Sequence, residues 1–277
     1  MRSISIPAHI RKLRDTVANT NDTRTAFIQQ HYKTLLKGAP EVSVVMPAYN
    51  EEKDILQTLH SLCANVTNRS VEIIVVNNNS KDNTEALVRA TGVTCVNETI
   101  QGITAARNAG LAAATGKYIL NADADTLYPK DWIELMVAPL ANNDNIAITY
   151  GRFSFIPTGV TSRFTYFFYE YAADALRYFN KFFREEAVNV YGFNSCYRRE
   201  QGIQVEGYNH PKGANEDGWL ALKLREKGFG KLHYVTNTKA IVWTTDRRIQ
   251  LDGGLIKGII KRIKRVVFGK AEAHSGL

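Results

Sequence analysis

Short β-branched runs alternate with segments of helical spacing in the first half of the chain, and this alternation limits the fold more than any other feature. Strands are predicted within residues 41–50, stopped by Pro47, and at 71–76, 93–96 and 117–120. Helices are predicted between them, at 51–62, 82–90 and 104–114. Strand–helix–strand repeats of this length form right-handed βαβ units. The pattern therefore predicts an α/β, Rossmann-like domain whose central sheet is mostly parallel and covered on both faces.

The composition is that of a globular protein. Hydrophobic residues make up 44% and charged residues 22% of the 277 residues, which excludes wholesale disorder and collagen-like repeats. No apolar run approaches the roughly 18 residues that span a bilayer, and the first residues have no apolar core of a secretory signal. Three separated cysteines without metal-site spacing indicate free thiols in a reducing cytoplasm.

The net charge of +8 is concentrated at the two ends of the chain. Residues 1–40 carry +5 and residues 247–277 carry +6, whereas residues 41–246 carry −3. This distribution argues against a nucleic-acid partner and favours basic appendages that touch an anionic surface. We predict a helical N-terminal extension at 1–40, a globular body at 41–246 and a basic tail at 247–277.

Polar clusters follow the predicted strands, where open parallel sheets bind their ligands. The glycine patterns of dinucleotide enzymes and P-loop NTPases are absent from the sequence. Asp123 and Asp125 instead form an Asp-Ala-Asp motif after the fourth strand. Such carboxylates suit Mn²⁺ or Mg²⁺, which complete their shell with substrate phosphates. Turn-forming aspartates are the alternative reading of this motif taken by itself.

Several further motifs occur with it in a fixed order. They are Pro47-Ala-Tyr-Asn-Glu51, Asn-Ser80-Lys-Asp82, Arg107-Asn108-Ala-Gly110, Asp123-Ala-Asp125, Gly192-Phe-Asn-Ser and Asn215-Glu216-Asp217-Gly-Trp219. Together they resemble glycosyltransferase family 2, the inverting, nucleotide-sugar-dependent transferases of GT-A fold, over about residues 41–245. The resemblance implies a nucleotide-binding half at about 41–130 and an acceptor-binding half at about 131–246.

The resemblance also implies roles for matching residues. The residues implied in nucleotide binding are Pro47, Ala48, Tyr49, Glu51, Asn78, Arg107, Asn108 and Asp123. Asp125, with Asp123, would hold the metal, and Asp217 would be the general base, with Glu216 as the next candidate. This chain has Asn77-Asn78-Asn79-Ser80 where members often have Asp-Asp-Gly-Ser. A UDP-sugar is the leading donor, and guanosine and thymidine donors stay open.

The Glu216-Asp217 pair also suits the N-terminus of the helix that follows it. A carboxylate within hydrogen-bond reach of an acceptor hydroxyl can remove its proton during attack. The product of such a single displacement is a β-linked sugar from an α-linked donor. Capping and catalysis are compatible, because capping can orient one carboxylate of the pair while the other accepts the proton.

Arg247 and Arg248 follow the last predicted strand, where adjacent arginines suit the donor diphosphate or form a solvated basic turn. Asp246 is a candidate third metal ligand. Residues 164–183 hold ten of the 28 aromatic residues and read as a packed helix or as an acceptor platform. Residues 255–268 form a basic amphipathic pattern that lies on an anionic membrane or packs on the body.

These observations predict a metal-dependent inverting glycosyltransferase that acts on a glycan or lipid-linked saccharide. The expected location is the cytoplasm, at the inner face of the cytoplasmic membrane. The alternatives are a retaining glycosyltransferase or nucleotidyltransferase on the same fold, and a non-catalytic, membrane-associated protein that binds sugar nucleotides.

Overall fold

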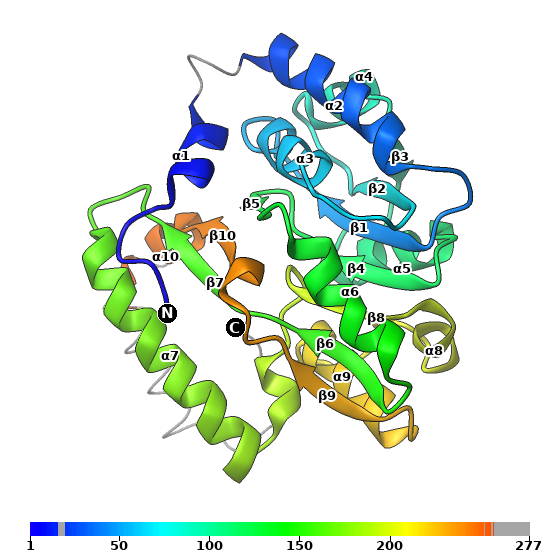
Figure 1. Cartoon of the computed structure of the whole chain (residues 1–277), viewed down its shortest axis with the longest axis vertical. Helices are drawn as coiled ribbons and strands as arrows, with labels where there is room; N and C mark the ends of the chain where they lie inside the picture. Colours follow the sequence, from blue (N-terminus) through cyan, green and yellow to red (C-terminus); the bar gives the residue numbers. More distant parts are fainter. Residues whose placement is uncertain (16–19, 252, 256, 258–277) are drawn as a thin grey trace.

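A seven-stranded sheet organises the chain (Figure 1). The computed structural model describes residues 1–15, 20–251, 253–255 and 257, and the backbone but not the side chain of Arg248. The strand order is β3-β2-β1-β4-β8-β6-β9, and all neighbours are parallel except that β8 runs antiparallel to both β4 and β6. The mostly parallel sheet is therefore confirmed. The strands are β1 (Val42–Ala48), β2 (Val71–Asn77), β3 (Thr94–Asn97), β4 (Tyr118–Asn121), β6 (Ile146–Tyr150), β8 (Ser195–Arg198) and β9 (Lys231–Tyr234).

Helices cover both faces of this sheet because successive strand residues point to opposite sides. Val44 and Met46 of β1 belong to one buried cluster, which includes side chains of the first helix group. Val45 lies in the other cluster, with side chains of α5 and α9. The first group is α2 (Asn21–Leu35), α3 (Ile55–Cys63), α4 (Thr84–Ala90) and α6 (Trp132–Asn142). The second side has α5 (Ile103–Ala113), α8 (Arg199–Gln204) and α9 (Glu216–Glu226).

The close approach of α5 to the sheet depends on Gly110. A Cβ at this position would collide with the side chain of Val45 on β1 and press on Val76 of β2. The small residue lets α5 lie directly on the two strands, so Arg107, one turn earlier on α5, is held at a fixed depth. The motif Arg107-Asn108-Ala-Gly110 thus combines a positioning glycine with a charged side chain.

A second, three-stranded sheet lies beside the first and has the order β5-β10-β7. Its strands are β5 (Thr126–Leu127), β7 (Phe153–Ile156) and β10 (Val242–Thr245). Ile10 of α1 (Ala8–Arg14) packs with Leu127 and Trp243 of this sheet. The remaining short elements are η1 (Glu186–Asn189), η2 (Thr238–Ala240) and α10 (Arg247–Leu251). β5 begins directly after Asp125, so the small sheet carries the chain away from the Asp-Ala-Asp motif.

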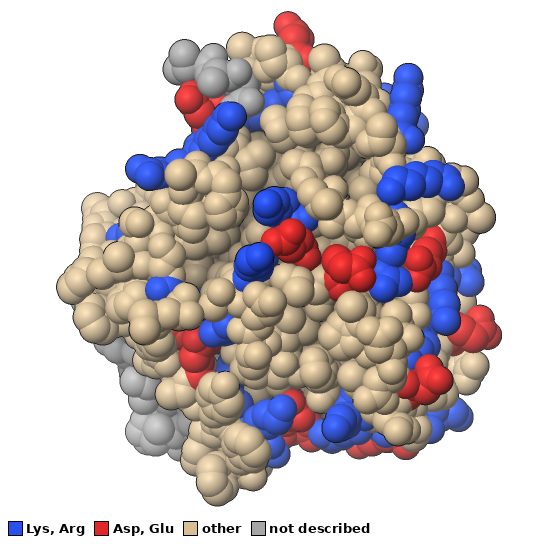
Figure 2. Space-filling view, viewed as in Figure 1, with Lys and Arg blue, Asp and Glu red and all other residues tan. Residues whose placement is uncertain are grey.

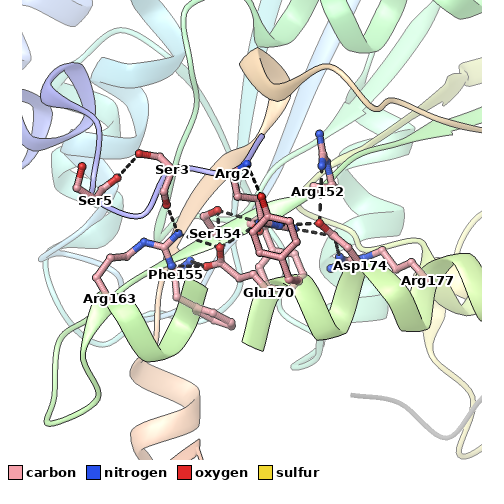
Figure 3. Close-up of polar contacts among 12 residues, drawn as sticks. Arg2, Ser3, Ser5, Arg152, Ser154, Phe155, Arg163, Glu170, Asp174 and Arg177 are labelled. Carbon is pink, nitrogen blue, oxygen red and sulfur yellow. Dashed lines mark hydrogen bonds and ion pairs between the residues drawn. The ribbon is translucent and has the colours of Figure 1, made fainter. Parts of the chain in front are cut away.

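The long helix α7 (Arg163–Phe183) runs along the edge of the molecule (Figure 1). Its buried side is polar: Arg2 donates to Asp174 through Nε and Nη2 at 2.7 and 2.8 Å and to Glu170 at 3.2 Å (Figure 3). Arg163 also pairs with Glu170, at 2.7 Å. From the sequence, this segment is a packed aromatic helix or an acceptor platform, and in the structure most of its aromatic side chains are exposed. Arg2, which lies far from α7 in sequence, is the ion-pair partner that allows the polar side of the helix to be buried.

Cys63, Cys95 and Cys196 are free thiols, as predicted. Across the described ranges, no helix combines the length and the apolar character that a bilayer crossing requires. The predicted amphipathic pattern at 255–268 lies outside the described residues, apart from Leu255 and Lys257.

Candidate active site

The loops that follow β1 and β2 are bound to each other. The backbone N–H of Glu51 donates to Thr84 Oγ1 at 2.8 Å, and that of Asn50 donates to Ser80 Oγ at 3.1 Å. Asn50 takes a left-handed φ of 56°, a conformation that asparagine tolerates better than most residues. The turn leaves Tyr49 half exposed above the sheet end. Pro47 and Ala48 are the last residues of β1, so this part of the predicted nucleotide set lies together at one strand end.

Asn78 holds the neighbouring loop in place. Its side-chain amide donates to the carbonyls of Glu98 and Ile100 at 3.0 and 2.7 Å, and its Oδ1 accepts from Gly102 N–H at 2.8 Å. The residue is 4% exposed. Its side chain therefore shapes the loop that leads into α5. Asn108 is similarly engaged, because its Oδ1 accepts from the Tyr208 N–H and its amide donates to Asn209.

Arg107, Asp123 and Asp217 meet in one cluster beyond the end of β4. Arg107 Nη2 donates to Asp123 Oδ1 at 3.0 Å, and Arg107 Nε lies 3.5 Å from Asp217 Oδ1. The side chains of Arg107 and Asp217 are 2% and 9% exposed, whereas that of Asp123 is 25% exposed. The buried guanidinium thus joins the first acid of the Asp-Ala-Asp motif to the second acid of the Glu216-Asp217 pair.

Two neighbours decide what Asp217 does at the start of α9. The helix is capped by Asn215, whose side chain accepts from the Gly218 N–H at 2.9 Å. Asp217 Oδ2 instead accepts from the Gly192 N–H at 2.7 Å. A Cβ at Gly192 would overlap both Asp217 and Arg107. Because Asn215 caps the helix, the Asp217 carboxylate is directed into the cluster and not at its own helix backbone.

This environment shifts the titration of both charged groups. Burial raises the pKa of Asp217 to about 7; the charge of Arg107 opposes the rise, and the negative charges of Glu216 and Asp123 add to it. Burial by itself would lower the pKa of Arg107, but the carboxylates of Asp217 and Asp123 raise it above its ordinary value. A carboxyl group that titrates near neutral pH suits proton transfer to or from a substrate hydroxyl.

Asp125 belongs to a second cluster, centred on Arg247. Arg247 Nη2 lies 2.5 Å from Glu51 Oε1 and 3.2 Å from Asp125 Oδ2. The hydrogen bond to Glu51 raises the pKa of Arg247. Arg247 is the first residue of α10 and its side chain is 40% exposed. Arg247 therefore lies at the sheet end beside two carboxylates, and its contact with a donor diphosphate stays a prediction.

The carboxylates of Asp125 and Glu51 are oxygen donors of the kind that a divalent cation takes, whereas Asp123 is paired with Arg107. The carboxylates of Asp125 and Glu51 both point at one guanidinium nitrogen, so their oxygens face a common cationic position. Among the described residues, no three His, Cys, Asp or Glu side chains are grouped to hold a metal ion. Mg²⁺ and Mn²⁺ ordinarily take one or two protein carboxylates and fill the other positions with water and phosphate oxygens.

Asp246, the candidate third ligand, is fully committed elsewhere. It is completely buried, and its oxygens accept hydrogen bonds from Thr158, Tyr166 and Gln250. These bonds fix the loop before α7 against α10. The expectation that Asp246 ligates a metal is therefore not supported by its geometry.

Two tyrosines complete the cluster and were not predicted from the sequence. Tyr128 Oη accepts from the Asp123 N–H at 2.8 Å, and Tyr208 Oη donates to Asn121 at 2.7 Å beneath the Arg107 guanidinium. Tyr128 also lines a cavity of about 580 Å³, together with Trp243 and Pro7. The residues that line this cavity do not include Arg107, Asp123 or Asp217. Figure 2 shows acidic and basic side chains side by side around a hollow near the middle of this face of the molecule.

A family model described as Glycosyl transferase family 2 matches residues 43–201, more than half of the chain. The chain belongs to this family. The match includes the β1 loop, Arg107 and the Asp-Ala-Asp motif, and it ends before Asp217. The family membership predicted from the ordered motifs is thus confirmed.

Curated relatives of this family 2 chain are similar over less than half of its length. An uncharacterized glycosyltransferase, YibD of Escherichia coli K12, is 30% identical over 133 residues, which are 46% of this chain and 38% of that protein. WfgD of Escherichia coli, named a UDP-Glc:alpha-D-GlcNAc-diphosphoundecaprenol beta-1,3-glucosyltransferase, is 30% identical over 42% of this chain and 46% of that protein. The chain spans less than half the length of the curated relatives that it matches.

Solved structures share the fold over a larger part of the chain. The mannosyltransferase PcManGT of Pyrobaculum calidifontis, in complex with GDP-Man and Mn²⁺, has a TM-score of 0.56 and 20% identity, covering 92% of this chain and 76% of that one. Glucosyl-3-phosphoglycerate synthase of Mycobacterium tuberculosis, in complex with Mn²⁺, UDP and phosphoglyceric acid, has a TM-score of 0.54 and 20% identity, covering 88% and 81%. These likenesses confirm the predicted GT-A-like fold.

Proposed function

We propose that this chain transfers one sugar from a nucleotide-sugar donor to a hydroxyl group of a glycan or lipid-linked saccharide, with inversion at the transferred carbon. A UDP-sugar is the donor that we propose first. The observation that carries the proposal is the position of Arg107, which contacts Asp123 of the Asp-Ala-Asp motif at 3.0 Å and Asp217 at 3.5 Å. One buried cation thereby couples the proposed donor side of the site to the proposed base.

The unused hydrogen-bonding groups of the cluster support a polar ligand there. Arg107 Nε and Nη1 are buried and donate no hydrogen bond within the described part of the chain, and Asp217 Oδ1 accepts none. Buried polar atoms in native proteins are normally satisfied by protein, water or ligand. We propose that Arg107 Nη1 contacts donor oxygens and that Asp217 Oδ1 accepts the proton of the attacking hydroxyl.

The donor half of the site is proposed on the β1 loop and the Asp-Ala-Asp motif. The exposed ring of Tyr49 and the end of β1 at Pro47 and Ala48 would contact the nucleoside, with Glu51 beside them. Asp125 and Asp123 would hold Mn²⁺ or Mg²⁺, and the metal would offset the charge that develops on the departing nucleoside diphosphate. Arg247 would release Asp125 on donor binding and face the diphosphate, as an arginine suits phosphate oxygens. A role for Arg248 beside it stays a proposal from the sequence.

The acceptor half is proposed around Asp217. Its pKa of about 7 leaves a substantial ionised fraction at neutral pH, and a base of this strength is matched to its task. Glu216 is the next candidate because it precedes Asp217 on the same turn and is half-buried.

We also propose that the chain is divided into an N-terminal extension at 1–40, a transferase domain at 41–246 and a basic tail at 247–277. Within the transferase domain, we propose a nucleotide half at 41–130 and an acceptor half at 131–246. A cytoplasmic location is part of this proposal.

The experiment is a donor screen with product analysis. Purified chain is incubated with UDP-, GDP- and dTDP-sugars, with Mn²⁺ or with EDTA, and the released nucleotide and the anomer of the product are measured. We expect nucleoside diphosphate release that needs the metal, and a β product from an α-linked donor.

Each alternative predicts a different result in the same experiment. Release of pyrophosphate would identify a nucleotidyltransferase, and an α product would identify a retaining transferase. Thermal stabilisation by a nucleotide sugar without turnover on any acceptor would favour a non-catalytic binding protein.

A further inference from the structure

The helix α7 carries its charged residues inside and its aromatic residues outside. Every charged residue of the helix is buried or half-buried, whereas its exposed positions are Phe, Tyr, Leu, Ala and one Thr. The aromatic face, as we call it, consists of Phe164, Phe168, Tyr171, Phe179, Phe182 and Phe183, which are 39–75% exposed. A surface helix of a soluble protein has the opposite arrangement.

The inward polar side explains why the aromatic face cannot turn to the core. Asp174 accepts from Arg2 at 2.7 and 2.8 Å and from Arg177 at 2.5 Å, and Glu170 accepts from Arg163 at 2.7 Å (Figure 3). Rotating the helix would break these buried ion pairs, and an unpaired buried charge is strongly destabilising. The rotation of α7 about its axis is therefore fixed, and the aromatic face stays outward.

The aromatic face is long and continuous. From Phe164 to Phe182 its members, with the exposed Ala175 between Tyr171 and Phe179, recur at intervals of three or four residues, and Phe183 lies four residues after Phe179. They therefore form one stripe along the 21 residues of α7. At 1.5 Å per residue this helix is about 31 Å long. α7 lies at the periphery in Figure 1. An exposed apolar strip of this kind marks a site of interaction with a protein or a membrane.

The charges around the aromatic face favour an anionic partner. Both acids of α7, Glu170 and Asp174, are neutralised by buried arginines. At the end of the helix Arg184 is exposed and stacks over the ring of Phe179 at 5.5 Å. Leu255 packs against Phe155 and Tyr166 beside α7, and the sequence after residue 257 contains five Lys or Arg and one Glu.

We propose that the aromatic face of α7 docks on the surface of an anionic phospholipid bilayer, with the helix lying in the plane of the interface. Phe side chains enter the boundary between headgroups and acyl chains. Arg184 meets lipid phosphates at the same depth. This inference does not depend on the proposed transfer reaction, because no residue of the aromatic face belongs to the charged clusters of the site.

The first test compares matched variants of the full chain. One carries Phe168→Gln, Phe179→Gln and Phe182→Gln, and its control carries Val66→Gln and Ile203→Gln, which replace apolar residues 67% and 43% exposed outside α7. Co-sedimentation is measured with vesicles of phosphatidylglycerol and phosphatidylcholine and with phosphatidylcholine alone. We expect the triple variant to bind the anionic vesicles at least about tenfold more weakly than the parent, and the control to bind as the parent does.

The second test reports on α7 directly. The variant Leu176→Trp places an indole at a position that is 56% exposed, and its fluorescence is followed with vesicles that contain brominated lipid. We expect a blue shift and quenching on addition of anionic vesicles. Nucleoside diphosphate release on a water-soluble acceptor without vesicles is measured for all variants and should match the parent, so failure of docking and failure of the transferase proposal are separate outcomes.

Four results would overturn the proposal. Equal sedimentation of the triple variant and the parent would assign binding to another part of the chain. Indole emission of the Leu176→Trp variant that is already blue-shifted and unchanged by vesicles would show that the chain itself covers the face. A parent dimer that the triple variant converts to a monomer in light scattering would make the face a self-association surface. A loss of turnover on the soluble acceptor would make it an acceptor platform.

Discussion

Arg107 Nε lies 3.5 Å from Asp217 Oδ1, and the two side chains are almost completely buried. The pair joins α5 to α9, two helices that lie on the same side of the sheet. Since Arg107 also donates to Asp123, a change at either acid alters the electrostatic environment of the other.

Activity should rise with pH and level off above about 7, because Asp217 must be ionised to accept a proton and burial raises its pKa to about 7. Glu216→Gln removes a negative charge that raises this pKa, so the profile of kcat/KM should move to lower pH. Glu226→Gln, at the exposed end of α9, is the control and should leave the profile unchanged. An unchanged or alkaline-shifted profile in E216Q would remove Asp217 as the titrating group.

Asp217→Asn keeps the shape of the side chain and removes the proton acceptor. We expect transfer to fall by about 10²–10⁴, while the affinity for the donor, measured by calorimetry, stays close to that of the parent. E226Q again serves as the control. Near-normal transfer by D217N would assign the base to another residue, and Glu216→Gln would then be tested for the same loss.

Asp125→Asn should lower turnover by several orders of magnitude without unfolding the chain, because an amide is a weaker ligand for a hard cation than a carboxylate. Turnover of the parent should be abolished by EDTA and restored by Mn²⁺. The matched control is Asp22→Asn, at an exposed position of α2. Full activity in EDTA would contradict metal dependence.

Arg2→Gln should lower the free energy of unfolding by about 3 kcal/mol, because it leaves the buried Asp174 and Glu170 with less compensation. Urea unfolding measures the loss, and Arg11→Gln, exposed on α1, should change stability by less than about 0.5 kcal/mol.

The loss of stability caused by Arg2→Gln should also depend on pH. Burial by itself would raise the pKa of Asp174, but its hydrogen bond and ion pair with Arg2 outweigh this, and the pKa lies below its ordinary value. A depressed carboxyl pKa stabilises the fold above the ordinary value of about 3.9 and ceases to do so as the pH falls through the folded-state value. The difference in stability between R2Q and the parent should therefore shrink in acid. A constant difference would show that Arg2 acts by packing alone.

The amino-acid sequence by itself determined the parallel sheet and the strand ends that carry the polar motifs. Runs such as Val71–Val76 are too short and too apolar for anything but buried strands, and Asp123 and Asp125 must then lie at a carboxyl strand end. These features are local, because hydrophobic period and chain-breaking residues specify them within a few positions. The order of the motifs along the chain was enough to indicate the family.

Only the tertiary structure decided which charges meet. The bonds from Arg107 to Asp123 and Asp217, from Arg247 to Glu51 and Asp125, and from Arg2 to Asp174 join residues distant in sequence. No local pattern encodes such pairs. The rotation of α7 is the clearest case: its sequence has one aromatic and one polar side, and hydrophobicity predicts that the aromatic side is buried. Arg2 reverses that choice, because the buried carboxylates on α7 require a positive partner that the fold supplies from outside the helix.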